Sequence, residues 1–155
     1  MKLLALLLPL ILVACASTPK SSPVAAKAVS DKAVSDRAAA HAATMVGKPY
    51  KYGGASPSGF DCSGLITFSY QQAGVSLPRS TAEQRRASQR VKLAELKRGD
   101  LLFFDERGRK ASHVGIYLGE RRFVHAPSSG KSVRNDSLDN PYWKKSLSEV
   151  RRLAS

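Results

Sequence analysis

The order of hydrophobic patterns divides this chain into a helical first half and a second half of short strands. Before about residue 90, apolar residues recur at helical spacing in segments bounded by glycine, proline and capping residues. From Leu101 onwards, apolar runs of a few residues alternate with charged turns that contain glycine. Helices followed by consecutive antiparallel strands predict an α+β fold.

Three helices are predicted in the first half. Their boundaries carry residues that helix ends prefer, with acidic or hydroxyl residues near the start and glycine after the end. One start has the spacing of a capping box, Ser80 with Glu83. The predicted ranges are 35–46, 62–74 and 80–88.

The second half predicts four strands and a short edge strand. Each is a short apolar run between turns, and consecutive strands joined by tight turns run antiparallel. The predicted ranges are 101–104, 113–118, 121–126 and 150–153, with the edge strand at 133–134.

The N-terminus has the pattern of a targeting segment. A positively charged start precedes the apolar run Leu3–Val13, which fits a signal-peptide core and is too short to span a bilayer. The run leads into Leu12-Val13-Ala14-Cys15, which resembles a bacterial lipobox, where the signal peptidase cuts before a cysteine that becomes lipidated. The alternative is an ordinary secretory peptide in which Cys15 is incidental.

The lipobox implies a signal peptide over 1–14, a lipidated tether over 15–34 and a single domain over 35–155. The tether has little to bury and is expected to be flexible. Several acyl chains on Cys15 would anchor the chain stably to a membrane. Because Ala16 rather than aspartate follows the cysteine, the resemblance favours the outer membrane of a bacterial envelope, with the domain facing the periplasm.

The chain is strongly basic, with 25 Lys and Arg against 12 Asp and Glu and a net charge of +13. Such a charge suits an anionic partner, for example nucleic acid, a lipid headgroup layer or an acidic polymer. The alternative is that it only maintains solubility. Nucleic acid is not an expected partner, because the lipobox places the chain outside the cytoplasm.

Cys62 follows a loop of Gly, Ser and Pro that starts at Gly53, and it precedes an apolar run. This places it on the first turn of a helix, where backbone N–H groups lack partners and the helix dipole is positive. Both features favour a thiolate, the reactive form of cysteine. Cys62 is therefore a candidate nucleophile, although a lone cysteine is more often a small buried hydrophobe.

Two of the three histidines lie at matching ends of neighbouring strands. His113 opens one predicted strand and His125 is near the end of the next, so antiparallel pairing places both at one end of the sheet. A cysteine nucleophile needs a histidine base and a group that orients it. Metal binding is the rival hypothesis, but the close ligand pairs of zinc sites are missing from the sequence. We expect no metal and no cofactor.

Four blocks in the sequence carry a family resemblance. They are Tyr52-Gly53-Gly54 with Phe60–Leu65, Arg98–Leu101 with Phe103-Phe104, His113–Tyr117, and Phe123–Ala126. In this order they resemble the NlpC/P60 family of cell-wall peptidases, over residues 38 to 153. The resemblance implies a reduced papain-like fold, with N-terminal helices packed on a small antiparallel sheet. Cysteine before histidine matches the unpermuted branch of the family.

The resemblance also implies roles for the matching residues. Cys62 would attack a peptide carbonyl, His113 would be its base, and His125 would orient His113. Tyr52 would hold its hydroxyl near the cysteine and help to stabilise the oxyanion; alternatively, it is a packing aromatic.

The implied substrate is a peptidoglycan stem peptide that contains diaminopimelate. Asp61 and Ser63 resemble the pair that contacts the substrate's free amine and peptide, and Arg79 is a candidate for its carboxylate. Two bonds are open: the D-alanyl-diaminopimelate cross-link, which the short lipoprotein layout favours, and the D-γ-glutamyl-diaminopimelate bond. A third hypothesis is a catalytically silent peptidoglycan-binding lipoprotein.

Overall fold

A computed structural model describes residues 23–128 and 132–153 of the chain. The predicted signal peptide over 1–14 and the predicted lipidation site, Cys15, lie outside the described residues. The described part combines helices with an antiparallel sheet of six strands, which confirms the predicted α+β class.

Two of the predicted helices lie where the sequence placed them, and the first starts earlier. It begins at Pro23 rather than near Ser35, so residues 23–34 are helical where the sequence predicted a flexible tether. Alanine has the highest helix propensity, and proline is well suited to the first helical position. The helices are α1 (Pro23–Thr44), α2 (Cys62–Gln72), α3 (Thr81–Arg86) and α4 (Pro141–Ser146), with a 3-10 turn, η1 (Leu93–Glu95).

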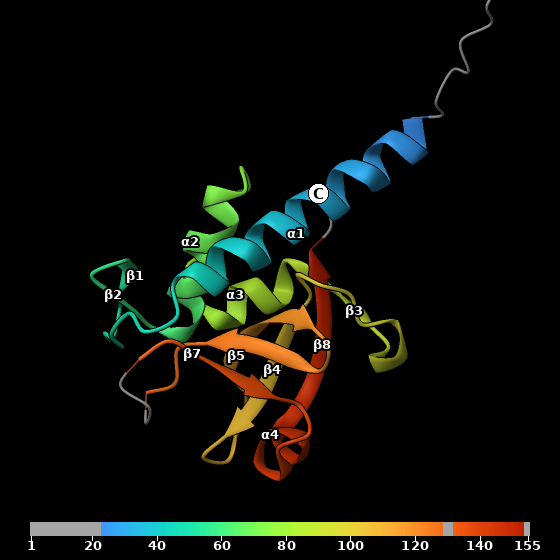
Figure 1. Cartoon of the computed structure of the whole chain (residues 1–155). Coiled ribbons are helices and arrows are strands. Elements are labelled where there is room, and N and C mark those ends of the chain that lie inside the picture. Colours follow the sequence, from blue (N-terminus) through green and yellow to red (C-terminus); the bar gives the residue numbers. More distant parts are fainter. Residues whose placement is uncertain (1–22, 129–131, 154–155) are drawn as a thin grey trace, which may run out of the picture.

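The main sheet has the strand order β3-β8-β4-β5-β6-β7, and every neighbouring pair is antiparallel. Its strands are β3 (Ser88–Val91), β4 (Leu101–Glu106), β5 (Arg109–Gly119), β6 (Arg122–His125), β7 (Arg134–Ser137) and β8 (Leu147–Leu153). A separate small hairpin of β1 (Ala55–Ser56) and β2 (Gly59–Phe60) precedes α2. Figure 1 shows α1, α2 and α3 on one side of the sheet and α4 on the other.

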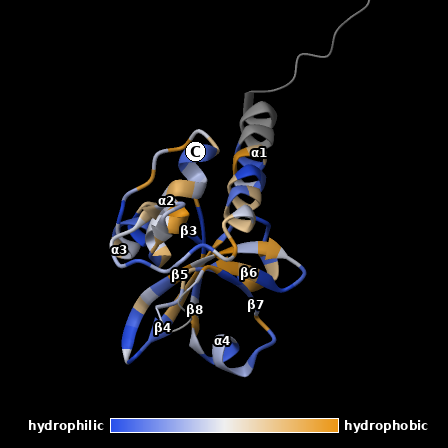
Figure 2. Ribbon diagram, turned by 60° about the vertical axis from the view of Figure 1, so that its left-hand side comes forward, coloured by the Kyte–Doolittle hydropathy of each residue, from blue (hydrophilic) through white to orange (hydrophobic). Residues whose placement is uncertain are grey.

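Helices on both sides bury both faces of the central strands. Along β4, Leu101 and Phe103 join the core formed with α1 and α2, whereas Leu102 and Phe104 join a second core with Trp143 of α4. This explains why the run is apolar at every position rather than alternating. Figure 2 shows the hydrophobic colour concentrated on these strands and on α2, while the β4–β5 turn is hydrophilic.

The sequence analysis missed β3 and α4. β3 has the sequence Ser-Gln-Arg-Val, which lacks an apolar run, and it forms because β8 lies beside it. α4 is only one and a half turns long, too short for a periodicity signal, although Asn140 caps it and Pro141 occupies its first turn. α4 places its Trp143 ring against His113 and His125.

Candidate active site

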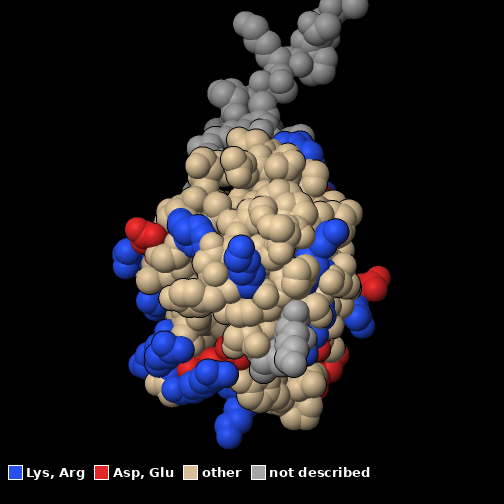
Figure 3. All heavy atoms as spheres, turned by 90° about the vertical axis from the view of Figure 1, so that its left-hand side faces the viewer, with Lys and Arg blue, Asp and Glu red and all other residues tan. Residues whose placement is uncertain are grey.

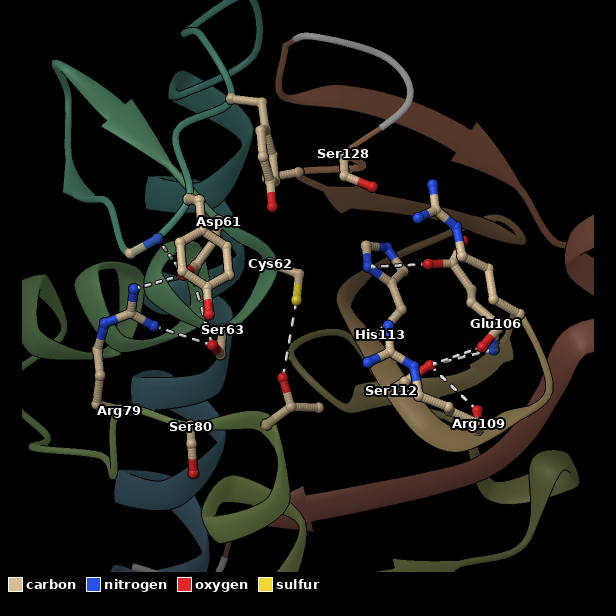
Figure 4. A pocket seen from close by; sticks show the side chains of 16 residues that line it. Asp61, Cys62, Ser63, Arg79, Ser80, Glu106, Arg109, Ser112, His113 and Ser128 are labelled. Atoms are coloured by element: carbon tan, nitrogen blue, oxygen red, sulfur yellow. Dashed lines mark hydrogen bonds and ion pairs between the residues drawn. The ribbon is translucent and has the colours of Figure 1, made fainter.

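A pocket of about 600 Å³ opens between the start of α2, the start of α3 and the β4–β5 hairpin. Cys62 of α2, Thr81 of α3 and His113 of β5 line it. Figure 4 shows Cys62 and His113 on opposite sides of this space, with their side chains directed into it. The pocket thus brings together the predicted nucleophile from the helical half and the predicted base from the strand half.

Cys62 is held at the first turn of α2 by the loop before it. Asp61 is the N-cap residue, and its Oδ1 accepts a hydrogen bond from the Gly64 backbone N–H over 2.7 Å. Gly64 also lies against the loop: a Cβ there would be 2.0 Å from the Gly54 carbonyl oxygen. Only glycine allows this approach, which keeps Cys62 facing the pocket.

The surroundings of Cys62 favour the neutral thiol, whereas its position at a helix start predicted a thiolate. Burial raises the pKa of Cys62, and the nearby Asp61 charge adds to this rise. The Thr81 hydroxyl, with its Oγ1 3.7 Å from Sγ, and the backbone N–H groups of Val114 and Ser63 act in the opposite direction. The expected lowering of the pKa is therefore wrong, because desolvation outweighs the helix start. The thiol is protonated at neutral pH and needs a base.

A chain of hydrogen bonds leads from the pocket to β7. His113 Nε2 lies 2.7 Å from His125 Nδ1, and His125 Nε2 lies 2.8 Å from Asp136 Oδ2. Arg134 Nε donates to the same Asp136 oxygen over 2.9 Å. The strand register produces this order, since His125 on β6 stands opposite Gly115 of β5 and Arg134 of β7. The two histidines are thus in contact, as predicted. His113 does not open its strand, however: it is the fifth residue of β5, because the β4–β5 hairpin continues to Arg109.

Aromatic rings enclose the histidine pair. The Trp143 ring of α4 stacks on His113 with a centroid distance of 5.7 Å and meets His125 edge-on at 4.7 Å. Phe104 and Phe123 complete the enclosure. His113 is 3% exposed and His125 is fully buried. This cover keeps water away from the hydrogen bond between the imidazoles.

Both imidazoles are neutral at pH 7. Burial is the main cause that lowers the pKa of His113 to about 3, and the neighbouring His125 and Arg134 lower it further. Burial also lowers the pKa of His125 to about 4, although Asp136 opposes it through its hydrogen bond and charge. A neutral His113 can accept a proton, which is what a general base requires.

These pKa shifts predict a loss of stability in mild acid. A buried histidine with a lowered pKa binds fewer protons when folded, so stability is complete above the unfolded pKa of about 6.5 and falls as the pH drops towards the folded value. Between pH 7 and pH 5 each histidine should cost on the order of 1–2 kcal/mol. Urea unfolding at the two pH values measures this. The control variant His41→Gln, on α1, should lose as much stability between pH 7 and pH 5 as the wild type. An unfolding midpoint of the wild type that is the same at both pH values would contradict buried neutral histidines.

Asp61 is occupied by donors from its own chain. Its Oδ1 accepts from Gly64 N and from the Ser63 hydroxyl, and its Oδ2 accepts from Gly53 N over 3.0 Å and from Arg79 over 2.6 Å. A carboxylate offers about four lone-pair sites, so all are used. Arg79 also donates to Ser63 Oγ, as Figure 4 shows. Asp61 and Ser63 line the pocket as expected, but a substrate amine at Asp61 would have to displace one of these donors.

The sequence analysis overlooked several pocket residues. Tyr52 lines the rim and is 90% exposed, whereas Tyr50 is half-buried in the same pocket, and burial together with the charges of Cys62 and Asp61 raises its pKa. Glu106 Oε2 lies 3.8 Å from His113 Nδ1. Tyr50 lies two residues before Tyr52, and the sequence alone does not show which tyrosine enters the pocket. Glu106 belongs to the charged segment that follows the strand predicted at 101–104.

The described residues contain neither a metal-binding cluster nor a membrane-spanning helix. No group of three or more His, Cys, Asp and Glu side chains in that part of the chain is arranged to hold a metal ion. Within the same ranges, no helix combines the length and apolar character needed to cross a membrane.

Comparisons with known sequences all point to one protein family. The family model described as NlpC/P60 family matches residues 47–152 of this chain. A Haemophilus influenzae protein named probable endopeptidase NlpC homolog is 43% identical over 109 residues, 70% of this chain and 57% of that protein. An Escherichia coli protein named murein DD-endopeptidase MepS/murein LD-carboxypeptidase is 43% identical over 110 residues, with the same coverage. The chain spans little more than half the length of these relatives.

Solved structures agree with the sequence matches. A Staphylococcus aureus protein described as similar to lipoprotein, NLP/P60 family, superposes with a TM-score of 0.71 at 38% identity, over 79% of this chain and 42% of that one. The NlpC/p60 domain of the peptidoglycan hydrolase SagA superposes with a TM-score of 0.66 at 33% identity, over 77% of this chain and 98% of that domain. These likenesses confirm the reduced papain-like fold, and the chain belongs to the NlpC/P60 family.

Proposed function

We propose that this chain is a cysteine peptidase that hydrolyses peptide cross-links in peptidoglycan. The observation that carries the proposal is the arrangement of Cys62 across a pocket from His113, which is hydrogen-bonded to His125. A nucleophile, a base and a group that orients the base are the three parts that acyl transfer requires. The relatives named murein DD-endopeptidases support the substrate class.

The chemistry follows from the protonation states. The Cys62 sulfur attacks the carbonyl carbon of the scissile amide while its proton passes to His113 Nδ1. The tetrahedral intermediate then collapses, the C–N bond breaks, and the leaving amine takes the proton from His113. Water, deprotonated by His113, hydrolyses the resulting thioester and restores the thiol. Because both groups start neutral, the reaction needs no preformed ion pair.

The start of α2 supplies donors for the developing oxyanion. The first N–H groups of a helix have no intrahelical acceptors, and Gly64 N is already bonded to Asp61. The N–H groups of Cys62 and Ser63 are then the candidates for an oxyanion hole, and that of Ser63 would exchange its contact with the resting thiol for the oxyanion. The predicted contribution of the Tyr52 hydroxyl would require this exposed side chain to fold inward over the bound substrate.

The charges of the pocket favour the cross-link over the D-γ-glutamyl bond. In a D-alanyl-diaminopimelate cross-link between tetrapeptides both diaminopimelate amines are acylated, and one of its two carboxylates is free. Three arginines line the pocket, Arg79, Arg107 and Arg109, against two carboxylates. Asp61 is already occupied, and Glu106 accepts from the Tyr142 hydroxyl. Arg79 keeps about two fifths of its side chain exposed, so its guanidinium remains accessible to a substrate carboxylate.

We further propose that the protein acts at the inner face of the outer membrane, anchored through acylated Cys15 as the lipobox resemblance implies. The tether and helical lead-in before residue 35 would set its reach into the cell wall. The net charge of +13 suits an envelope of anionic lipids and wall polymers. Figure 3 shows Lys and Arg scattered over one face and gathered at its lower left, next to a smaller acidic area.

Mass analysis of muropeptides tests the proposal directly. Sacculi that contain diaminopimelate, incubated with the purified protein, should lose cross-linked dimers and gain monomeric tetrapeptides, each split adding one water. Heat-denatured protein is the blank. Products shortened to dipeptides would instead identify the D-γ-glutamyl bond. Unchanged muropeptides, with the protein sedimenting on the sacculi, would identify a silent binding protein.

A further inference from the structure

Two proton orders are possible along a hydrogen bond between two neutral imidazoles, and only one suits catalysis. Each neutral imidazole has one nitrogen that donates and one that accepts. If His113 Nε2 carries the proton and donates to His125, then His113 Nδ1 has a free lone pair. If His125 Nδ1 donates instead, the proton of His113 sits on Nδ1, and the base cannot accept the thiol proton.

Asp136 decides between these orders. Its pKa is lowered by its hydrogen bonds to His125 and Arg134, which outweigh its partial burial, so it is ionised and can only accept. His125 Nε2, at 2.8 Å, must therefore be the donor, which leaves His125 Nδ1 as an acceptor. His113 Nε2, 2.7 Å away, must then donate to it. We infer that Asp136 is a positioning residue that fixes the proton order and leaves His113 Nδ1 free to act as the base.

The other charged and titratable groups around the pair do not impose this order. Glu106 from β4 approaches His113 Nδ1, but at 3.8 Å it is beyond hydrogen-bond distance. Arg134 from β7 contacts Asp136 and not an imidazole. Cys62 from α2 faces the pocket side of His113. Trp143 from α4 contributes only its ring faces and edges to both imidazoles.

The pair has no substitute for this carboxylate inside the enclosure. His125 is fully buried, and among the described residues its imidazole is hydrogen-bonded to His113 and Asp136. Asp136 itself lies at the edge, with 22% of its side chain exposed. Replacement of Asp136 by alanine would let water reach His125 Nε2, and water can both donate and accept a hydrogen bond. Both proton orders would then be populated.

The inference rests on the proposed function, and its test has a readout that does not depend on activity. Histidine side-chain 15N NMR distinguishes an Nδ1–H imidazole from an Nε2–H imidazole. In the wild type, both His113 and His125 should be Nε2–H. Asp136→Ala should give a mixture at both positions. Asp139→Ala is the matched control. It removes an exposed carboxylate that is paired with Arg121 and does not line the pocket, so it should leave both imidazoles as Nε2–H.

Activity provides the second readout. Asp136→Ala should lower kcat by about 10- to 100-fold and leave KM within about twofold, because the change affects the base and not substrate contacts; loss of a partner that orients a histidine has effects of this size or larger. In Asp136→Asn, Arg134 Nε, which donates to the same oxygen as His125, favours the amide oxygen at this position, so the variant should keep the Nε2–H order and recover most of the loss. Urea unfolding checks that both variants fold.

The inference is overturned if Asp136→Ala keeps both imidazoles as Nε2–H, or if its kcat stays within about twofold of the wild type. It is also overturned if Asp136→Asn loses as much kcat as Asp136→Ala. An inactive wild type with the expected NMR pattern would overturn the proposed function and leave the proton order standing.

Discussion

Replacing Cys62 by alanine is expected to reduce the rate of cross-link hydrolysis by at least about 10⁴-fold, because alanine has no nucleophilic atom to form the acyl intermediate. Cys62 is the only free cysteine among the described residues, and it lines the pocket opposite His113. The residual rate would come from binding and the oxyanion donors alone. Release of monomeric muropeptides from sacculi, followed by mass analysis, measures it.

Cys62→Ser is the matched control for this prediction. It keeps the size of the side chain and the contact with Thr81, but an alkoxide is far harder to form than a thiolate, so its rate should also be very low. The free energy of unfolding of both variants should lie within about 1 kcal/mol of the wild-type value. Both should also bind sacculi as well as the wild type does. Equal muropeptide release by wild type and Cys62→Ala would refute a cysteine mechanism and with it the enzymatic proposal.

Replacing His113 by glutamine is expected to cost nearly as much as losing the nucleophile, roughly 10³- to 10⁴-fold at pH 7. Burial raises the pKa of Cys62, so without a base its thiol stays protonated. The double variant Cys62→Ala with His113→Gln should be no slower than Cys62→Ala alone, since residues that act as one unit give non-additive losses.

Glutamine is preferred to alanine here because His113 packs against both Phe104 and Trp143, and a truncation would leave a cavity. His41→Gln, on α1 and away from the pocket, should retain full activity. The residual rate of His113→Gln should rise with pH as the thiol ionises by itself. A His113→Gln protein with wild-type activity at pH 7 would show that another group serves as the base.

The predicted parts of the fold are those encoded by neighbouring residues. The capping box of Ser80 with Glu83 defined one helix start locally, and it occurs in the structure. The Asp61 cap of α2 is equally local, although the sequence analysis did not name it. The apolar run at 101–104 encoded a buried strand without reference to its partners. Consecutive strands with tight turns then placed His113 and His125 at one end of the sheet, which is why their contact could be anticipated from order alone.

The parts that could not be predicted depend on residues far apart in the chain. β3 and β8 pair across more than half of the domain, and neither carries a strong pattern of its own. Arg79 meets Asp61 because the loop before α3 folds back on α2, and this contact changes Asp61 from a free acidic group into a saturated one. The electrostatic character of a side chain depends on such partners, which composition and spacing do not reveal.

The sequence by itself determined the class of fold, the nucleophile candidate and the two histidines, because each depends on local periodicity or on strand order. The tertiary structure alone decided the protonation states. Burial of Cys62 keeps the thiol neutral, burial under Trp143 keeps both imidazoles neutral, and Asp136 on β7 sets where their protons lie. Desolvation and hydrogen-bond direction arise only when distant segments pack together, so the reactive state of the site is a property of the fold.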